Sequence, residues 1–257
     1  MTDDADMQYL AIAVVGFMAG AINAVAGSGS LLTFPTLLAL GYSPLVANVS
    51  NSVGLTFGNV SASFGYRREL SGQRRRALGL GLCSLVGGVG GAILLLDLPH
   101  QVFRLIVPAL VVFAVVLLLF QPRLAKLRAA RQQRRESAQE ERHGPLLPAA
   151  VLATAVYGGY FGAAQGVILI AALGVFIDDT LQRLNGLKNV LAATANGAAS
   201  IVFIIRAPIA WEAALVIAAA SILGGQLGAG IGRRLPPAVL RWVVIVGGLA
   251  AVAKLLL

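Results

Sequence analysis

Two short polar breaks interrupt strongly apolar sequence and carry residues suited to binding an anion. The first is Gly27-Ser28-Gly29-Ser30, and the second is Gln165-Gly166. A half-helix that begins at such a break presents backbone N–H groups and the positive end of its dipole to an anion. Glycines let an oxyanion approach the backbone, and serines add hydroxyl donors. The breaks therefore predict anion binding, with a plain kink or a tight helix crossing as the alternative.

Polar side chains with the same spacing follow both breaks. The first set is Asn48, Asn51 and Ser52, and the second is Asn185, Lys188 and Asn189. Residues at i, i+3 and i+4 share one face of a helix. We predict that both sets line one substrate-binding cavity. For the asparagines, the alternative is interhelical hydrogen bonding, worth about 0.6–2 kcal/mol per contact.

Lys188 adds a positive charge to this set, several residues into a helix expected to begin near Thr180. A lysine inside a membrane is costly and usually marks a pathway or has a specific partner. We predict that Lys188 neutralises a bound anion. Two alternatives place its ammonium at the cytoplasmic interface or pair it with Asp178 or Asp179.

The composition indicates which elements position these residues. The chain has 257 residues, of which 58% are hydrophobic and 12% are charged. A soluble domain carries about 25% charged residues. Apolar runs of about 20 residues, the length that crosses a bilayer, recur along the chain. The clearest lie at 77–96, 102–120, 191–205 with its flank, 213–231 and 239–257. We predict an all-α, multi-pass protein of the bacterial cytoplasmic membrane.

The net charge of +9 does not indicate nucleic-acid binding, because 12 of the 20 basic residues lie in two loops, at 67–76 and 123–142. Basic loops between apolar spans follow the positive-inside rule. The single Cys83 cannot form an intrachain disulfide. With only two histidines, the sequence gives little support for a histidine-rich metal site or a Ser-His-Asp site. We therefore expect no cofactor and no metal.

An internal repeat organises the chain. Residues 84–107 match residues 221–244 at 10 of 24 positions without a gap, an offset of 137. Each half reads as a broken-helix hairpin followed by three transmembrane helices, about eight helical segments in all. The predicted domains are transmembrane repeat one (1–120), a basic and partly helical cytoplasmic loop (121–146) and transmembrane repeat two (147–257).

Charge favours an inverted relation between the halves. Three crossings per half invert the second half, and with the N-terminus outside every basic cluster, including Arg233-Arg234, falls on the cytoplasmic side. Four full crossings per half would instead make the halves parallel and place Arg233-Arg234 outside. The acidic start at Asp3, Asp4 and Asp6 favours a retained first helix over a cleaved signal peptide, which would have a basic n-region.

Two sequence segments resemble the TauE/SafE family of membrane transporters. They are GFMAGAINAVAGSGSLLTFPTLLALGYSPLVANVSNSVG and YGGYFGAAQGVILIAALG. The second segment departs from the family pattern, because Ala163-Ala164-Gln165-Gly166 stands where the family has several consecutive glycines. The resemblance implies transport of small anions such as sulfite, sulfoacetate, other organosulfur compounds or organic acids, commonly outward.

Together these features predict a secondary transporter or facilitator that exports a small anion through a midplane site between two repeats. The alternatives are an anion importer and a membrane scaffold without transport. An intramembrane enzyme would need a nucleophile–base pair or metal ligands within the spans, and the sequence offers neither. The expected partners are a small anion and the lipid bilayer, with no nucleic acid, and a homo-oligomer is compatible with the sequence.

Overall fold

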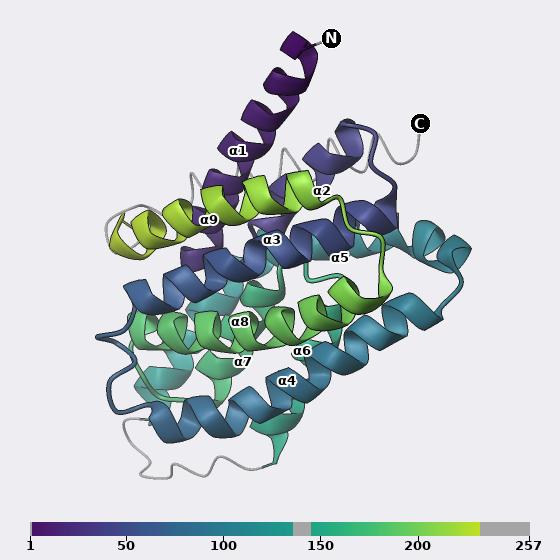
Figure 1. Cartoon of the computed structure of the whole chain (residues 1–257). Helices are drawn as coiled ribbons and strands as arrows, with labels where there is room; N and C mark the ends of the chain where they lie inside the picture. Colours follow the sequence, from purple (N-terminus) through teal and green to yellow (C-terminus); the bar gives the residue numbers. More distant parts are fainter. Residues whose placement is uncertain (1, 136–144, 232–257) are drawn as a thin grey trace.

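The computed structural model describes residues 2–135 and 145–231, and these residues fold into nine helices without a strand (Figure 1). The helices are α1 (Thr2–Val25), α2 (Ser30–Ala39), α3 (Pro44–Gly65), α4 (Arg74–Asp97), α5 (His100–Arg135), α6 (Leu146–Tyr160), α7 (Gln165–Phe176), α8 (Leu181–Arg206) and α9 (Trp211–Ile231). Five of them, α1, α4, α5, α8 and α9, are long and apolar enough to cross a membrane. The predicted all-α membrane class is confirmed. The run at 239–257 and Arg233-Arg234 lie outside the described residues.

The helix α3 has spanning length, at 22 residues, but it is not among the five apolar spans. Its sequence is rich in small polar residues, and most of these are buried within the protein. The buried polar residues of α3 are Asn48, Ser50, Asn51, Ser52, Asn59 and Ser61. A helix of this kind is stable in a membrane only where other helices, rather than lipid, surround its polar side chains.

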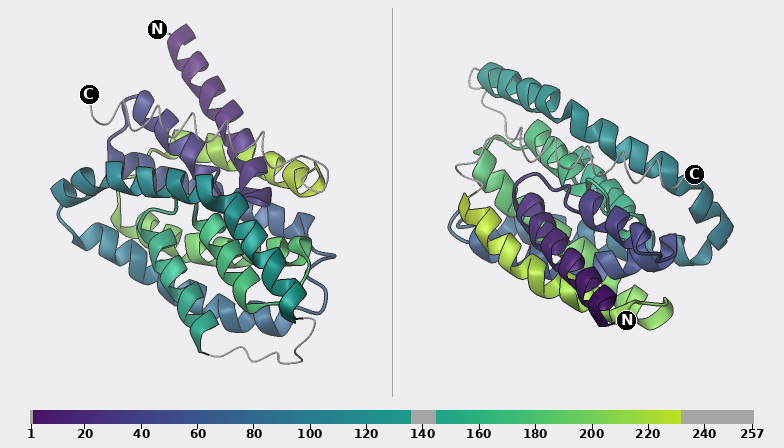
Figure 2. Two further views of the ribbon diagram at one scale, coloured as in Figure 1. Left: turned by 180° about the vertical axis from the view of Figure 1, so that it is seen from behind. Right: turned by 90° about the horizontal axis from the view of Figure 1, so that it is seen from above.

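Four helices, α9, α3, α8 and α4, lie side by side in that order and form one layer (Figure 1). Behind this layer, α1 packs on α9 and α6 packs on α4. The short helices α2 and α7 contact α3 and α8, respectively, and α5 runs along the far side of α7 (Figure 2). The helix α5 continues to Arg135, so the first part of the predicted loop at 121–146 is helical.

Glycine contacts set the relative directions of the helices. A Cβ on Gly54 of α3 would meet Ile217 of α9, and one on Gly65 would meet Ala229, so α3 and α9 run in the same direction. Similarly, Gly16 of α1 meets Ile217 and Gly20 of α1 meets Ser221. The helices α1, α3 and α9 are therefore mutually parallel.

The helices α4, α6 and α8 run the opposite way. The helices α4 and α8 are parallel, because ion pairs join Arg76 to Asp179 near their starts and Asp97 to Arg206 at their ends. Gly87 of α4 meets Ala155 of α6, and Gly91, one turn later, meets Tyr160, so α4 and α6 are parallel. The start of α8 lies beside the end of α3, because Gly186 would contact Tyr66. The helix α8 is thus antiparallel to α3.

Matched hydroxyl caps start the two central helices. The Oγ of Ser43 accepts a hydrogen bond from the N–H of Val46 at 3.5 Å and precedes α3. The Oγ1 of Thr180 accepts one from the N–H of Arg183 at 3.4 Å and precedes α8. Ser and Thr are preferred at this position because their oxygen satisfies an otherwise unpaired N–H group. The two caps stand 137 residues apart, which is the offset of the internal repeat.

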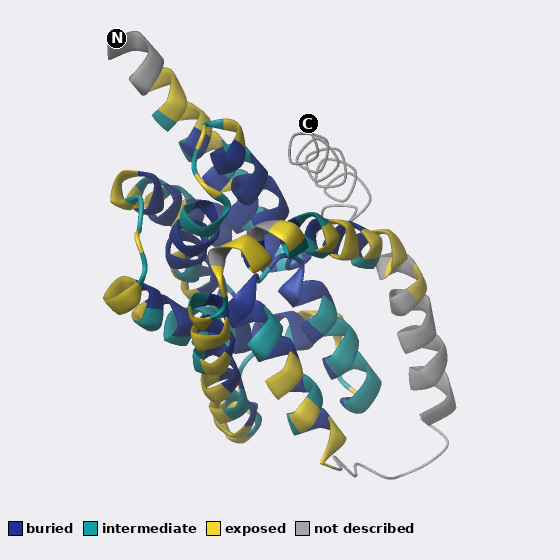
Figure 3. Ribbon diagram, turned by 90° about the vertical axis from the view of Figure 1, so that its right-hand side faces the viewer, coloured by how far each residue is buried: buried dark blue, intermediate teal, exposed yellow. Residues whose placement is uncertain are grey.

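The apolar core surrounds the ends of the short helices, and buried residues fill the middle of the bundle (Figure 3). The ring of Phe34 in α2 meets that of Phe161, just after α6, edge to face with centroids 5.2 Å apart. The ring of Phe103 in α5 lies 6.4 Å from the same Phe161 ring. Aromatic packing of this type holds the connections at the centre in place.

Candidate functional site

The first break lies where the sequence predicted it. The N–H groups of Ala26 and Gly27 both donate to the carbonyl of Ile22, at 2.7 and 3.1 Å, and end α1. Gly27 has φ +76°, a left-handed conformation that glycine adopts without steric cost. The helix α2 then begins at Ser30 and runs for 10 residues, about 15 Å, half of the hydrocarbon core.

The second break has the same geometry but lies earlier than predicted. The N–H groups of Phe161 and Gly162 donate to the carbonyl of Tyr157 at 2.9 and 3.1 Å, and Gly162 has φ +75°. The helix α6 therefore ends at Tyr160, and the predicted break at Gln165-Gly166 is wrong by a few residues. Those two residues instead form the start of α7, because Gly162 supplies the left-handed turn.

The two breaks contact each other. The N–H of Gly166 donates to the carbonyl of Gly27 at 3.0 Å, and the Oγ of Ser30 donates to the carbonyl of Gly162 at 3.3 Å. A Cβ added to either Gly27 or Gly166 would collide with the backbone of the other. Glycine at both positions thus permits a backbone contact between two segments that lie far apart in the sequence.

A small polar cavity of about 20 Å³ lies beside this contact. Eight of the twelve predicted site residues line it: Gly27, Ser30, Asn51, Ser52, Gln165, Gly166, Lys188 and Asn189. A volume of this size holds about one water molecule. An anion of several heavy atoms would therefore require the cavity to widen.

Four predicted residues, Ser28, Gly29, Asn48 and Asn185, are not among the residues lining the cavity. The N–H of Gly29 donates to Oδ1 of Asn23 at 2.6 Å, so one of the amides expected to face an anion is already satisfied. The Nδ2 of Asn48 donates to the carbonyl of Tyr160 at 3.0 Å and caps the end of α6. For Asn48 the structure thus shows the interhelical hydrogen bond that was the alternative.

Three asparagines that line the cavity, Asn23, Asn59 and Asn196, were not among the predicted site residues. Asn59 and Asn196 stand 137 residues apart, like Ser52 and Asn189. Applying the repeat offset of 137 residues to all polar residues of α3 and α8 would have identified this pair. Asn23 has no amide counterpart to reveal it, since position 160 is Tyr160.

Lys188 is the buried cation of the cavity, with 1% of its surface exposed. Its Nζ donates to the carbonyls of Asn23 at 2.8 Å and Ala24 at 3.2 Å, at the negative C-terminal end of α1. The Nδ2 of Asn189 donates to the same Ala24 carbonyl at 3.1 Å. An ammonium has three donors, so these two contacts leave one for a ligand in the cavity.

Both alternatives for Lys188 are wrong. Burial rules out a position at the interface, and none of the described carboxylates lies within ion-pair distance of its Nζ. Asp179 instead pairs with Arg183, with 2.8 Å between Nε and Oδ1. A buried ammonium without an anionic partner leaves its charge for a bound anion to neutralise.

Several amide atoms around the cavity have no hydrogen-bond partner among the described residues. They are Nε2 and Oε1 of Gln165, Oδ1 of Asn189 and Oδ1 of Asn196. Buried polar atoms are nearly always paired in proteins, and exceptions frequently mark sites that bind water or ligands. In the described part of the chain, no three His, Cys, Asp or Glu residues cluster in a way that could hold a metal ion.

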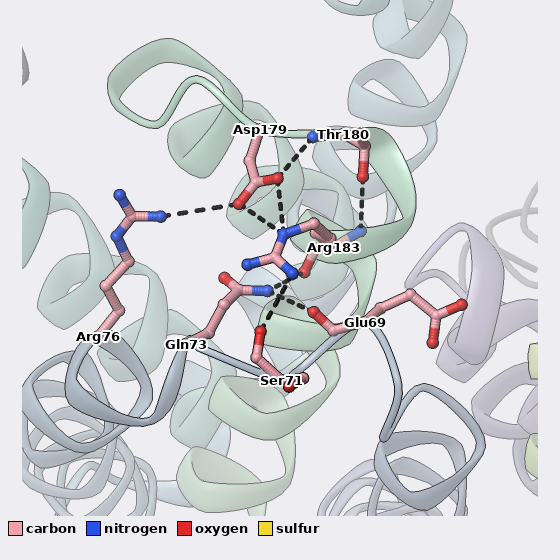
Figure 4. Close-up of polar contacts among 7 residues, drawn as sticks. All are labelled: Glu69, Ser71, Gln73, Arg76, Asp179, Thr180 and Arg183. Carbon is pink, nitrogen blue, oxygen red and sulfur yellow. Dashed lines mark hydrogen bonds and ion pairs between the residues drawn. The ribbon is translucent and has the colours of Figure 1, made fainter.

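Polar contacts tie together two loops at one end of the bundle, the loop before α4 and the loop before α8 (Figure 4). Asp179 is the centre of these contacts, which we call the polar lock: its carboxylate binds Nε of Arg183 and lies 3.7 Å from Nη1 of Arg76. The Nε2 of Gln73 donates to the carbonyl of Arg183 at 3.1 Å, and Nη1 of Arg183 donates to the carbonyl of Ser71 at 3.1 Å.

The opposite end of the bundle has its own polar contacts. The Nη2 of Arg206, at the end of α8, lies 2.8 Å from Oδ1 of Asp97, at the end of α4. The hydroxyl of Tyr9 in α1 donates to the carboxylate of Glu212 in α9. The cavity residues therefore lie between two polar ends, each closed by contacts between helices of different halves.

A polytopic helical bundle that encloses a polar cavity between two broken helices is typical of secondary transporters. The chain belongs to the TauE/SafE family, since residues 12–255 match the family described as "Sulfite exporter TauE/SafE". This is a family of membrane transporters and not of enzymes, and the protein is a multi-pass membrane protein.

Relatives with similar sequences carry the same general description. The "Probable membrane transporter protein YfcA" of Escherichia coli K12 is 28% identical over 246 residues, covering 94% of this chain and 87% of the relative. The "Probable membrane transporter protein" of Haemophilus influenzae is 27% identical over 243 residues, covering 94% of this chain and 91% of the relative. No solved structure matches the chain significantly.

Proposed function

We propose that the chain is a secondary transporter or facilitator that exports a small anion across the bacterial cytoplasmic membrane. The substrate class is sulfite, an organosulfonate or an organic acid. The observation that carries this proposal is the buried ammonium of Lys188, which lines the cavity beside the contact between the two breaks and has no carboxylate partner in the described residues. The unpaired Nε2 of Gln165 supplies a further donor for an oxyanion.

We infer that residues 1–120 and 147–257 are inverted repeats. The packing of α1 on α9 corresponds to the packing of α6 on α4. One group of parallel helices, α1, α3 and α9, runs opposite to the other group, α4, α6 and α8. Both breaks end their helices with a left-handed glycine, Gly27 or Gly162. Inverted repeats of this kind place a substrate at their interface, and rocking of one group against the other exposes it to alternate sides.

The membrane potential would drive the export. Outward movement of a monovalent anion is favoured by about 2.3 kcal/mol per 100 mV of inside-negative potential. The residues that line the cavity include no carboxylate, and Lys188 is the titratable group among them. Uniport or channel-like passage therefore suits the site at least as well as proton coupling.

Because the cavity holds about one water molecule, export of a larger anion requires the polar lock to open. We expect Asp179→Asn to weaken the contacts with Arg183 and Arg76 and to increase access from that end. Partly exposed ion pairs contribute about 0.2–1 kcal/mol, which corresponds to a shift of about 1.5- to 5-fold in the open population. The measurement is the labelling rate of Asn196→Cys, in a Cys83→Ser background, by a thiol reagent applied from the inner side.

The matched control is Asp97→Asn, which breaks the ion pair with Arg206 at the opposite end. This variant should not increase labelling from the inner side. If Asn196→Cys is labelled equally fast with Asp179→Asn and with Asp179 intact, the contacts of Asp179 do not limit access to the cavity.

The function itself is tested by flux in liposomes that contain the purified protein. Vesicles are loaded in turn with sulfite, sulfoacetate, a sulfonate and a carboxylate, and efflux is followed at a fixed potential. Efflux of one anion class well above that of protein-free vesicles supports the transporter. Binding of the anions without flux supports the scaffold alternative, and flux accelerated only in the inward direction supports the importer.

A further inference from the structure

A groove separate from the central cavity lies between α3 and α8, close to the loop before α4. Its volume is about 690 Å³, far larger than that of the central cavity. Val60 and Phe64 from α3 and Val190 from α8 form an apolar wall. The side chains of Val60 and Phe64 are 40% and 62% exposed, so this wall faces outward.

Two arginines stand at the loop end of this groove. Arg67 and Arg74 both line it, and both are exposed. The only acceptor that the described residues give the Arg67 side chain is the carbonyl of Phe64, 3.3 Å from Nη1, and neither arginine has an ion pair with a described carboxylate. Their neighbour Arg76 differs, because it lies 3.7 Å from Asp179.

The start of α4 concentrates positive charge where a helix disfavours it. Arg74, Arg75 and Arg76 occupy the first turn, which has no acidic residue, and the side chain of Gln73 does not cap the helix. Cations at the positive end of a helix are unfavourable, whereas anions there are stabilised. The positive-inside rule accounts for basic residues in this loop, but an anion bound at the groove would also offset their repulsion.

We propose that this groove binds one anionic glycerophospholipid. The phosphate lies between Arg67 and Arg74, and an acyl chain lies along Val60, Phe64 and Val190. Basic pockets between transmembrane helices are suited to anionic headgroups. The exposed apolar wall distinguishes a lipid from a soluble anion, because only a lipid carries a chain that covers it. This site is independent of the transport proposal.

The groove and the central cavity share their two helices. Asn59 and Asn189 line the cavity, and the next residues in sequence, Val60 and Val190, line the groove. A lipid between α3 and α8 therefore contacts the same helices that hold the cavity. Its binding is coupled to the spacing of those helices, so the protein with bound lipid unfolds at a higher temperature.

Native mass spectrometry of the full chain, titrated with phosphatidylglycerol, tests the proposal. The double variant Arg67→Gln/Arg74→Gln should lose at least tenfold in affinity for the first lipid. The matched control Arg68→Gln/Arg75→Gln removes two exposed arginines that neighbour Arg67 and Arg74 but do not line the groove, and it should bind like the wild type. Phe64→Gln, which keeps both arginines, should weaken binding several-fold.

Two further arms identify the ligand. Phosphatidylcholine should bind equally weakly to all variants, and sn-glycerol 3-phosphate should not displace phosphatidylglycerol. Equal losses in the two double variants would overturn the site, because bulk charge alone would then explain binding. Displacement by glycerol phosphate at similar concentration would overturn the lipid assignment in favour of a free anion. Size-exclusion profiles and thermal midpoints confirm that each variant is folded.

Discussion

Replacing Lys188 with methionine should reduce anion flux by about 10- to 150-fold. Hydrogen bonds to charged groups contribute about 1.5–3 kcal/mol, and the ammonium of Lys188 is the cation that lines the cavity. Methionine has similar length and fills the same space without charge. The measurement is the initial efflux rate of the preferred anion from liposomes with equal amounts of protein.

The same substitution removes a donor from the end of α1, so its structural effect must be separated from its effect on the anion. Loss of the contacts with Asn23 and Ala24 costs about 1–3 kcal/mol of stability, partly offset because a buried charge is also removed. The control is Ser61→Ala, which removes a hydroxyl that donates to the carbonyl of Ile222 at 2.7 Å, away from the cavity. Ser61→Ala should retain anion flux within about threefold of the wild type. If Lys188→Met transports the anion at the wild-type rate, Lys188 is not part of the substrate site.

The second large effect is expected for Gly27→Ala, which should prevent stable assembly of the two breaks. An alanine at φ +76° costs about 1–2 kcal/mol, and its Cβ would collide with the backbone of Gly166. Overpacking adds about 1–3 kcal/mol, so the total is about 2–5 kcal/mol. The measurement is the thermal unfolding midpoint of the purified protein, with the amount recovered from membranes.

Gly41→Ala is the matched control for backbone strain. Gly41 has φ +91°, but a Cβ there would meet nothing within 4 Å. This variant should lose only the strain term, about 1–2 kcal/mol, and should retain flux. If the two alanine variants have equal midpoints, the contact between Gly27 and Gly166 does not stabilise the protein.

The sequence predicted much of the fold because membrane helices have strong signals. Length and hydropathy located α4, α5, α8 and α9, and Gly27-Ser28-Gly29-Ser30 located the first break. The second break was misplaced because Gln165-Gly166 resembled the first motif, whereas the turn is made by Gly162 within an aromatic segment. The positive φ of Ala164, a residue type that rarely adopts it, also could not be anticipated.

The site was only partly predictable for a different reason. Helical spacing placed Asn51, Ser52, Lys188 and Asn189 on the correct faces, and all four line the cavity. Spacing does not reveal which polar groups bond to a neighbouring helix, so it left open whether Asn48 lines the cavity or makes an interhelical hydrogen bond, as it does to Tyr160. The partner of Lys188 is a pair of backbone carbonyls of a distant helix, and a sequence contains no signal for a contact of that kind.

Protection of a cavity cysteine by the transported anion tests whether the anion binds between the two breaks. Asn196→Cys lines the cavity, whereas Ala198→Cys is a partly buried site on the same helix that does not line it, and both are made in a Cys83→Ser background. Binding between the breaks predicts that the anion slows thiol labelling at position 196 in a saturable way and leaves position 198 unchanged. Labelling that the anion leaves unchanged at both positions, in protein that transports it, would contradict the proposed site.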